Sequence, residues 1–208
     1  MLRYLVIPCA VLLAGLSPAA AQTVQSPPTL SYQIIPRLSQ ASYAVDEVFI
    51  RENFRLFTAV GITPGVAGEI LFDQNSPAGA RVQEIVVDLQ QLTSDSDRRD
   101  RAIRERYLES NRYPFARLTN AVLSGLPVTI VEGTPFRYTL AGDLTAHDVT
   151  RPTSWDGEAT VAGDTLRGVA RTRITMSNFG IDAPKLPFVR AEDDVKLEIR
   201  YVAVLRKP

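Results

Sequence analysis

The sequence predicts an all-β fold, namely an eight-stranded antiparallel barrel with one helical insertion. From Tyr43 onward the dominant hydrophobic period is two residues, which is typical of strands with one dry and one wet face. Clusters of Gly, Pro, Asn and Asp separate the apolar segments, and one segment changes to a helical period. About eight strands that share one polar face close naturally into an up-and-down barrel.

The last predicted strand shows the two-residue period most clearly. Its dry face consists of Val195, Leu197, Ile199, Tyr201, Ala203 and Leu205, and its wet face includes Lys196, Glu198 and Arg200. The segments that begin at Phe136 and at Leu166 repeat this alternation. Turn residues bound further predicted strands near residues 42–48, 65–73, 80–89, 115–123 and 151–161.

One segment, from Asp95 to Ser110, predicts a helix instead of a strand. Ile103, Tyr107 and Leu108 lie at helical spacing, and acidic residues stand at the start, where they favour the helix dipole. The sequence therefore predicts one amphipathic helix within a long connection between strands.

The N-terminal end has the order of charge, apolar run and small residues that is typical of a secretory signal peptide. We expect the signal peptide over residues 1–21, a flexible leader over residues 22–38 and the barrel over residues 39–208. The expected location is periplasmic or secreted. Cys9 is the only cysteine of the chain, so a chain cleaved after Ala21 has no disulfide and no thiolate.

Charge and composition exclude several classes of function. The formal net charge is zero with both signs interspersed, which is unlike the basic footprint of a nucleic-acid binder. The acidic run Glu192, Asp193 and Asp194 has no His or Cys near it in the sequence, so we interpret it as a charged turn and expect no metal site. No cofactor is expected.

The most specific motif is the stretch from Leu140 to Pro152, LAGDLTAHDVTRP. It resembles the GDLTxHGVTxP signature of the YceI-like family of polyisoprenoid-binding proteins. The segments 94–104, Tyr113-Pro114 and 177–181 also fit the family in order. One position departs from the signature, because Asp148 stands where the family has glycine; Asp tolerates a left-handed backbone less readily than glycine does.

The resemblance implies a lipocalin-like barrel with a helical insertion over part of its mouth and an apolar tunnel for a prenyl or alkyl chain. Expected partners are a polyisoprenoid quinone, a prenyl phosphate or another long-chain lipid, with no nucleic acid; a homodimer is left open. The head-group candidates are Arg98, Arg99 and His147. The candidates for the inner, ligand-binding face are Tyr43, Val45, Ile70, Phe72, Val87, Leu89, Leu118, Val122, Phe136, Tyr138, Leu140, Trp155, Phe179, Leu197, Ile199 and Tyr201.

Two alternatives stay open at this point. A barrel of this size either fills its interior with side chains or leaves room for one small ligand, so a solid barrel that acts as a structural or interaction module of the cell envelope is the first. The second is a hydrolase that uses His147, the only histidine. A catalytic role would need a nucleophile and an orienting carboxylate beside His147 in space, which the sequence does not indicate, so we expect no enzymatic activity.

Overall fold

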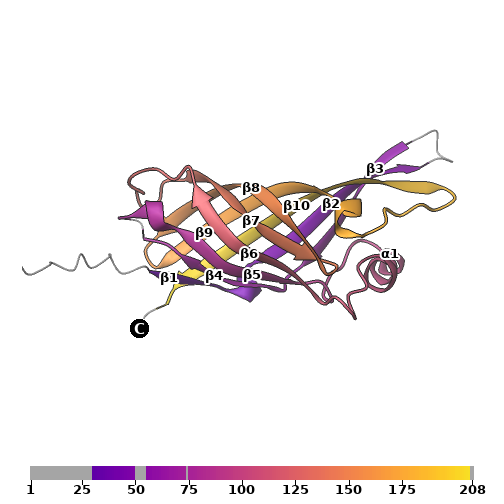
Figure 1. Cartoon of the computed structure of the whole chain (residues 1–208), viewed down its shortest axis with the longest axis horizontal. Helices are drawn as coiled ribbons and strands as arrows, with labels where there is room; N and C mark the ends of the chain where they lie inside the picture. The colour runs from indigo at the N-terminus through magenta and orange to yellow at the C-terminus, as the bar shows by residue number, and fades with distance from the viewer. Residues whose placement is uncertain (1–29, 50–54, 74, 207–208) are drawn as a thin grey trace, which may run out of the picture.

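The computed structural model describes residues 30–49, 55–73 and 75–206, which form one barrel of antiparallel strands (Figure 1). Its strands are β1 (Ser31–Ile34), β2 (Gln40–Phe49), β3 (Arg55–Thr63), β4 (Val66–Leu71), β5 (Arg81–Asp88), β6 (Phe115–Ser124), β7 (Phe136–Ala146), β8 (Val149–Ala162), β9 (Thr165–Thr175) and β10 (Val189–Leu205). Its helical elements are α1 (Asp97–Ala102), a π-helical turn (Ile103–Tyr107) and short 3₁₀ turns at Pro36–Leu38, Pro77–Gly79 and Met176–Phe179.

Ten strands occupy eight positions around the barrel, because two of the positions are each shared by two strands. β1 and β2 both pair with β10, one beyond the other, with the 3₁₀ turn Pro36–Leu38 between them. β3 pairs with β2, and β4 pairs with β1 and β5. The sheet closes where β1 meets both β4 and β10. The predicted eight-stranded antiparallel barrel is therefore confirmed.

Two strands were not predicted from the sequence. The expected leader over residues 22–38 contains β1, in which Tyr32 and Ile34 are buried in the core, so the prediction is wrong for this part. A strand of this length shows too little alternation to be recognised beside three prolines. β3 lacks a clear period, because apolar residues stand on both of its faces. The predicted signal peptide and residues 22–29 lie outside the described residues.

The predicted helix is present but shorter than expected. α1 begins after Ser96, whose Oγ accepts a hydrogen bond from the Arg99 backbone N–H at 3.4 Å, and it continues as a single π-helical turn. Asp100 faces inward and is buried, and its carboxylate accepts a 2.5 Å hydrogen bond from the Ser94 hydroxyl. The insertion is thus fixed to its own N-terminal flank, at one end of the barrel (Figure 1).

A bulge in β6 makes the predicted orientation of one side chain wrong. The register of β6 against β7 shifts between Thr119 and Val122, and Asn120 has a positive φ of 51°. The extra residue reverses the alternation, so Ala121 is buried while Val122 is 59% exposed. The prediction that Val122 faces the interior is therefore wrong.

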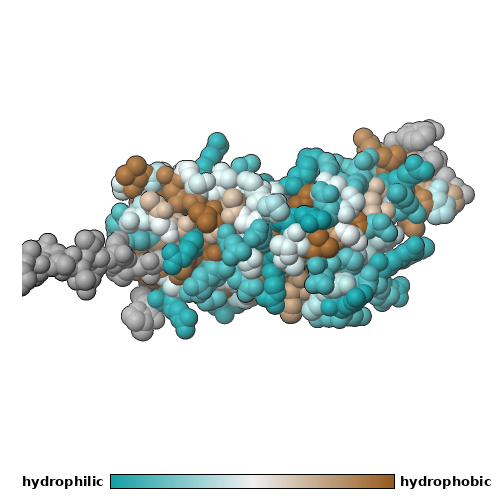
Figure 2. All heavy atoms as spheres, viewed as in Figure 1, coloured by the Kyte–Doolittle hydropathy of each residue, from teal (hydrophilic) through white to brown (hydrophobic). Residues whose placement is uncertain are grey.

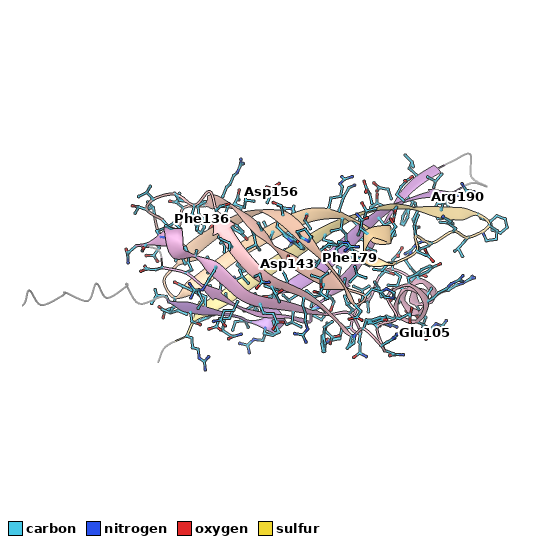
Figure 3. All side chains as sticks on the ribbon, in the orientation of Figure 1. Glu105, Phe136, Asp143, Asp156, Phe179 and Arg190 are labelled. Carbon is cyan, nitrogen blue, oxygen red and sulfur yellow. The ribbon has the colours of Figure 1, made fainter. Side chains whose placement is uncertain are left out.

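The core is one continuous hydrophobic cluster along the inside of the barrel. At the end opposite α1, the rings of Phe72 and Phe136 stack with their centroids 6.1 Å apart. Phe179 is buried nearer to α1 (Figure 3). Hydrophilic residues cover much of the outer surface in the view of Figure 2, with apolar patches toward the two ends. Within the described residues, no helix has the length and apolar character that crossing a membrane requires.

Candidate ligand-binding site

The barrel encloses an apolar cavity on its axis. The volume open to the centre of a water molecule is about 20 Å³, which is room for about one water molecule. The predicted inner residues that line it are Ile70, Phe72, Leu118, Phe136, Tyr138, Leu140, Trp155, Ile199 and Tyr201. Any ligand larger than water requires these side chains to move apart.

The other predicted inner residues lie away from this cavity. Val45 and Phe179 are buried in the core cluster that also contains the lining residues, and Leu89 is buried outside that cluster. Tyr43, Val87 and Leu197 are half-buried and pack against the core.

Six lining residues were missed by the sequence prediction: Val82, Ile85, Leu123, Ala159, Leu166 and Ala170. A signal for two of them was present. Counting in twos from Trp155 leads to Ala159, and counting in twos from Leu166 leads to Ala170. The two alanines were not predicted because the prediction selected large apolar side chains. Their small side chains leave space beside the cavity.

Two tyrosines bring hydroxyl groups to the cavity wall. Tyr138 and Tyr201 are both buried, and their hydroxyl oxygens are 3.1 Å apart. Burial raises the pKa of Tyr138 to about 12 and raises the pKa of Tyr201 well above its ordinary value. The third polar side chain of the lining is Trp155, whose Nε1–H donates a 2.9 Å hydrogen bond to Thr153 Oγ1.

At the end of the barrel that bears α1, the predicted head-group arginines differ in setting. Arg98 is exposed. Arg99 forms an ion pair with Glu47 of β2, at 3.7 Å, and a second ion pair with Asp95, which precedes α1. Its guanidinium also lies 5.9 Å from the ring centroid of Phe57. The guanidinium of Arg99 is thus already paired with two carboxylates of the protein.

Burial shifts the pKa of two side chains of β2 that lie at these ion pairs, Tyr43 and Glu47. The Tyr43 hydroxyl is buried and has no hydrogen-bond partner among the described residues, and burial raises its pKa to about 12. Burial also raises the pKa of the Glu47 carboxyl, although the Arg99 charge opposes that shift. The cluster of Arg99, Glu47, Asp95 and Asp100 contains more acidic than basic groups.

His147 lies in the two-residue turn between β7 and β8. His147 and Asp148 have φ values of 51° and 62°, and the flanking residues Ala146 and Val149 pair directly. Positive φ at both central positions is the geometry of a type I′ hairpin turn, so Asp148 adopts the left-handed conformation in place of the family's glycine. His147 Nε2 lies 3.3 Å from Glu109 Oε1, and the His147 and Tyr113 rings are 4.6 Å apart.

These contacts indicate a structural role for His147. The hydrogen bond joins the β7–β8 turn to the segment after α1, and no serine hydroxyl bonds to the imidazole in the described part of the chain. The described residues also contain no group of His, Cys, Asp and Glu side chains that could hold a metal ion.

A closed antiparallel barrel of eight strand positions is an architecture that either fills its interior with side chains or encloses one small ligand. The chain belongs to the YceI-like domain family, whose sequence profile matches residues 32–203. A UPF0312 protein of Vibrio vulnificus (strain YJ016) is 26% identical over 140 residues, which are 64% of this chain and 65% of that protein. A UPF0312 protein of Vibrio campbellii is 24% identical over 163 residues, 75% of each chain.

Solved structures with the same fold share little sequence with this chain. BcnA of Burkholderia cenocepacia superposes with a TM-score of 0.62 at 16% identity, covering 82% of this chain and 99% of BcnA. A polyisoprenoid-binding domain from Saccharophagus degradans, implicated in plant cell wall breakdown, gives a TM-score of 0.59 at 14% identity and covers 85% and 99%. The YCEI protein of Campylobacter jejuni gives 0.56 at 17% identity and covers 71% and 85%. The similarity lies in the fold.

Proposed function

We propose that this protein is exported and binds an isoprenoid-type or other long-chain lipid in the apolar interior of its barrel, without changing the lipid chemically. The observation that carries the proposal is the apolar inner face of the barrel, whose aliphatic and aromatic side chains surround the cavity. Membership of the YceI-like family and the polyisoprenoid-binding domain with the same fold support it.

The energetic balance of binding depends on side-chain movement. Each methylene group that leaves water contributes about 0.8 kcal/mol, so a chain of several isoprene units offsets the cost of repacking the interior. Hydrogen bonds between neighbouring strands hold the barrel backbone, whereas aliphatic residues such as Leu118, Leu123 and Leu166 have other rotamers. The space for the lipid therefore comes from these side chains.

The ion pairs of Arg99 favour a neutral head group beside this residue. A prenyl phosphate would need cationic donors, but Glu47 and Asp95 already neutralise Arg99, and Asp100 adds a further acidic group close by. A quinone carries no charge and needs no counter-ion. Beside Arg99, a polyisoprenoid quinone is thus favoured over a prenyl phosphate.

One observation favours a second candidate function. The cavity has room for about one water molecule, as expected of a barrel whose interior is packed with side chains and which acts as a structural or interaction module of the cell envelope. The two candidates differ in whether a lipid accompanies the protein.

The test is mass spectrometry of organic extracts from protein purified without detergent from a bacterium that makes prenylated quinones. The lipid-binding function predicts a long-chain lipid in near-stoichiometric amount. Ala170→Leu is the matched control, because it adds bulk to the cavity wall and should lower the lipid content of folded protein. An extract without lipid, together with no lipid uptake by the purified barrel, would establish the solid-core candidate.

Export has its own test. Cleavage after Ala21 predicts that the exported chain begins at Gln22, as N-terminal sequencing would show. A retained leader, or a lipid attached at Cys9, would contradict this part of the proposal.

A further inference from the structure

The cavity wall carries two hydroxyl groups that face each other from strands that are not neighbours. Tyr138 belongs to β7 and Tyr201 to β10, with β8 and β9 between them. The two hydroxyl oxygens are nevertheless 3.1 Å apart, and both side chains are buried. The two hydroxyl groups therefore contact each other inside the barrel, across the inner face of β8 and β9.

Two glycines make this meeting possible. Gly157 of β8 pairs with Tyr138, and Gly168 of β9 pairs with Tyr201. A Cβ atom on either glycine would overlap the side chain of its paired tyrosine. Each tyrosine thus lies against the bare backbone of the neighbouring strand, so that rigid elements position the hydroxyl pair.

The pair contains one more hydrogen-bond donor than it uses. Two phenol groups have two O–H donors, and the bond between them uses only one. Neither hydroxyl forms another hydrogen bond with the described residues, so the second O–H has no acceptor there. An unmatched donor in an apolar interior is costly, and a bound molecule with an oxygen acceptor would remove that cost.

The rest of the wall determines the kind of oxygen that fits. The lining has no charged residue, and Trp155 donates its N–H to Thr153. A phosphate oxygen at this depth would be a buried charge without a counter-ion, which is strongly unfavourable. A carbonyl, ester or ether oxygen accepts a hydrogen bond without bringing a charge.

We propose that the Tyr138–Tyr201 pair is a hydrogen-bond donor site for an uncharged oxygen of the bound lipid. This inference rests on the proposed lipid-binding function and narrows its ligand to a neutral lipid that carries an oxygen at the end inside the barrel. The site lies in the cavity, apart from the predicted head-group arginines. Burial keeps both phenols protonated at neutral pH, because it raises the pKa of each, so both remain donors.

The test compares squalene with squalene epoxide, two isoprenoids of the same carbon skeleton that differ by one ether oxygen. Trp155 is the only tryptophan of the chain and lines the cavity, so its fluorescence reports binding of either probe. We expect the wild-type protein to bind the epoxide about three- to tenfold more tightly, which corresponds to one net hydrogen bond.

The number of O–H donors left in each variant of the pair predicts its preference between the two probes. Tyr138→Phe and Tyr201→Phe each leave one O–H, now free for the ligand, so each single variant should keep the preference for the epoxide. The double variant has no donor and should bind both probes equally. Tyr32→Phe is the matched control, because Tyr32 is buried against Phe72 outside the cavity lining and its loss of a hydroxyl should leave the preference unchanged.

The outcomes separate this inference from the function on which it rests. Equal binding of both probes by the wild-type protein, or a preference that persists in the folded double variant, would overturn the donor site but not lipid binding. If the wild-type protein binds neither probe nor any other long-chain lipid, both proposals fail. Should the double variant not fold, Tyr138→Met combined with Tyr201→Phe serves as a second donor-free variant, and equal binding of both probes by the wild-type protein would overturn the donor site in any case.

Discussion

At the scale of single residues, Glu198 shows how the outer face of the barrel is held by charge. Its carboxylate accepts hydrogen bonds from Arg171, at 2.6 Å, and from Arg200, at 2.5 Å. Burial by itself would raise the pKa of Glu198, but the two arginines outweigh burial and lower the pKa from 4.5. Glu198 thus links its own strand, β10, to β9.

The lowered pKa predicts a pH-dependent contribution of Glu198 to stability. A carboxyl whose pKa is lower in the folded state stabilises the fold above the unfolded value of 4.5, and this contribution disappears as the pH falls through the folded value. Glu198→Gln should therefore be less stable than the wild-type protein at neutral pH, with a gap that closes in acid. Denaturant unfolding at several pH values measures this gap. Glu192→Gln, at an exposed position that forms no ion pair with the described residues, is the control. A stability difference between Glu198→Gln and the wild-type protein that does not change with pH would contradict the account.

Ile199 tests which face of β10 is inside. Its side chain is 5% exposed and lines the cavity, so Ile199→Asp places an unpaired carboxylate in the core. We expect this variant either not to fold or to lose about 3 kcal/mol or more of unfolding free energy. Ser154→Asp puts the same charge on an exposed position of β8 and should change stability little. Urea titration followed by circular dichroism compares the two; a stable Ile199→Asp barrel would mean that the face is wrongly assigned.

At the scale of elements, the turn between β7 and β8 shows how a hairpin tolerates an unfavourable residue. Asp148 takes a φ of 62°, a conformation that favours glycine, and the hairpin still pairs Ala146 with Val149. The His147 contacts with Glu109 and Tyr113 tie the same turn to the segment after α1.

The turn geometry predicts that Asp148→Gly stabilises the protein. The change should add about 1 kcal/mol or less, because glycine adopts this conformation without strain, whereas Asp only tolerates it. Asp148→Val should be destabilising, since a β-branched side chain fits the same φ poorly. Thermal unfolding of both variants measures the two effects. A glycine variant with a lower melting temperature would contradict the assigned turn.

The elements that could be predicted from the sequence are those with a long, regular period. β10 and β7 were predicted because their apolar and polar residues alternate over many positions, as an inner and an outer face require. β1 is too short for a period to be visible, and the apolar residues of β3, such as Leu56, Phe57 and Val60, stand on both faces.

The same limits apply to the candidate site. The two-residue period identified large lining residues such as Trp155 and Tyr201. It could not predict that a bulge at Asn120 turns Val122 outward. The bond between the two tyrosine hydroxyls was also beyond prediction, since it depends on the positions of four strands and on Gly157 and Gly168.

At the scale of the whole molecule, the closure of the barrel determines where a ligand can be accommodated. β10 pairs along its length with β9, β2 and β1, so the sheet has no seam at which these strands could part without loss of backbone hydrogen bonds. The interior is apolar and nearly filled, with a cavity of about 20 Å³. Binding of a long-chain lipid must therefore rearrange side chains within a fixed wall.

The central claim, that the interior of the barrel takes up a lipid, is tested most directly by titrating the purified protein with a long-chain prenylated benzoquinone while following Trp155 fluorescence. Trp155 is the only tryptophan and lines the cavity, so a quinone inside the barrel must approach it. The account predicts saturable quenching at one equivalent, which Ala170→Leu weakens without unfolding the protein. Quenching that does not saturate, or that is unchanged in a folded Ala170→Leu variant, would contradict binding in the interior.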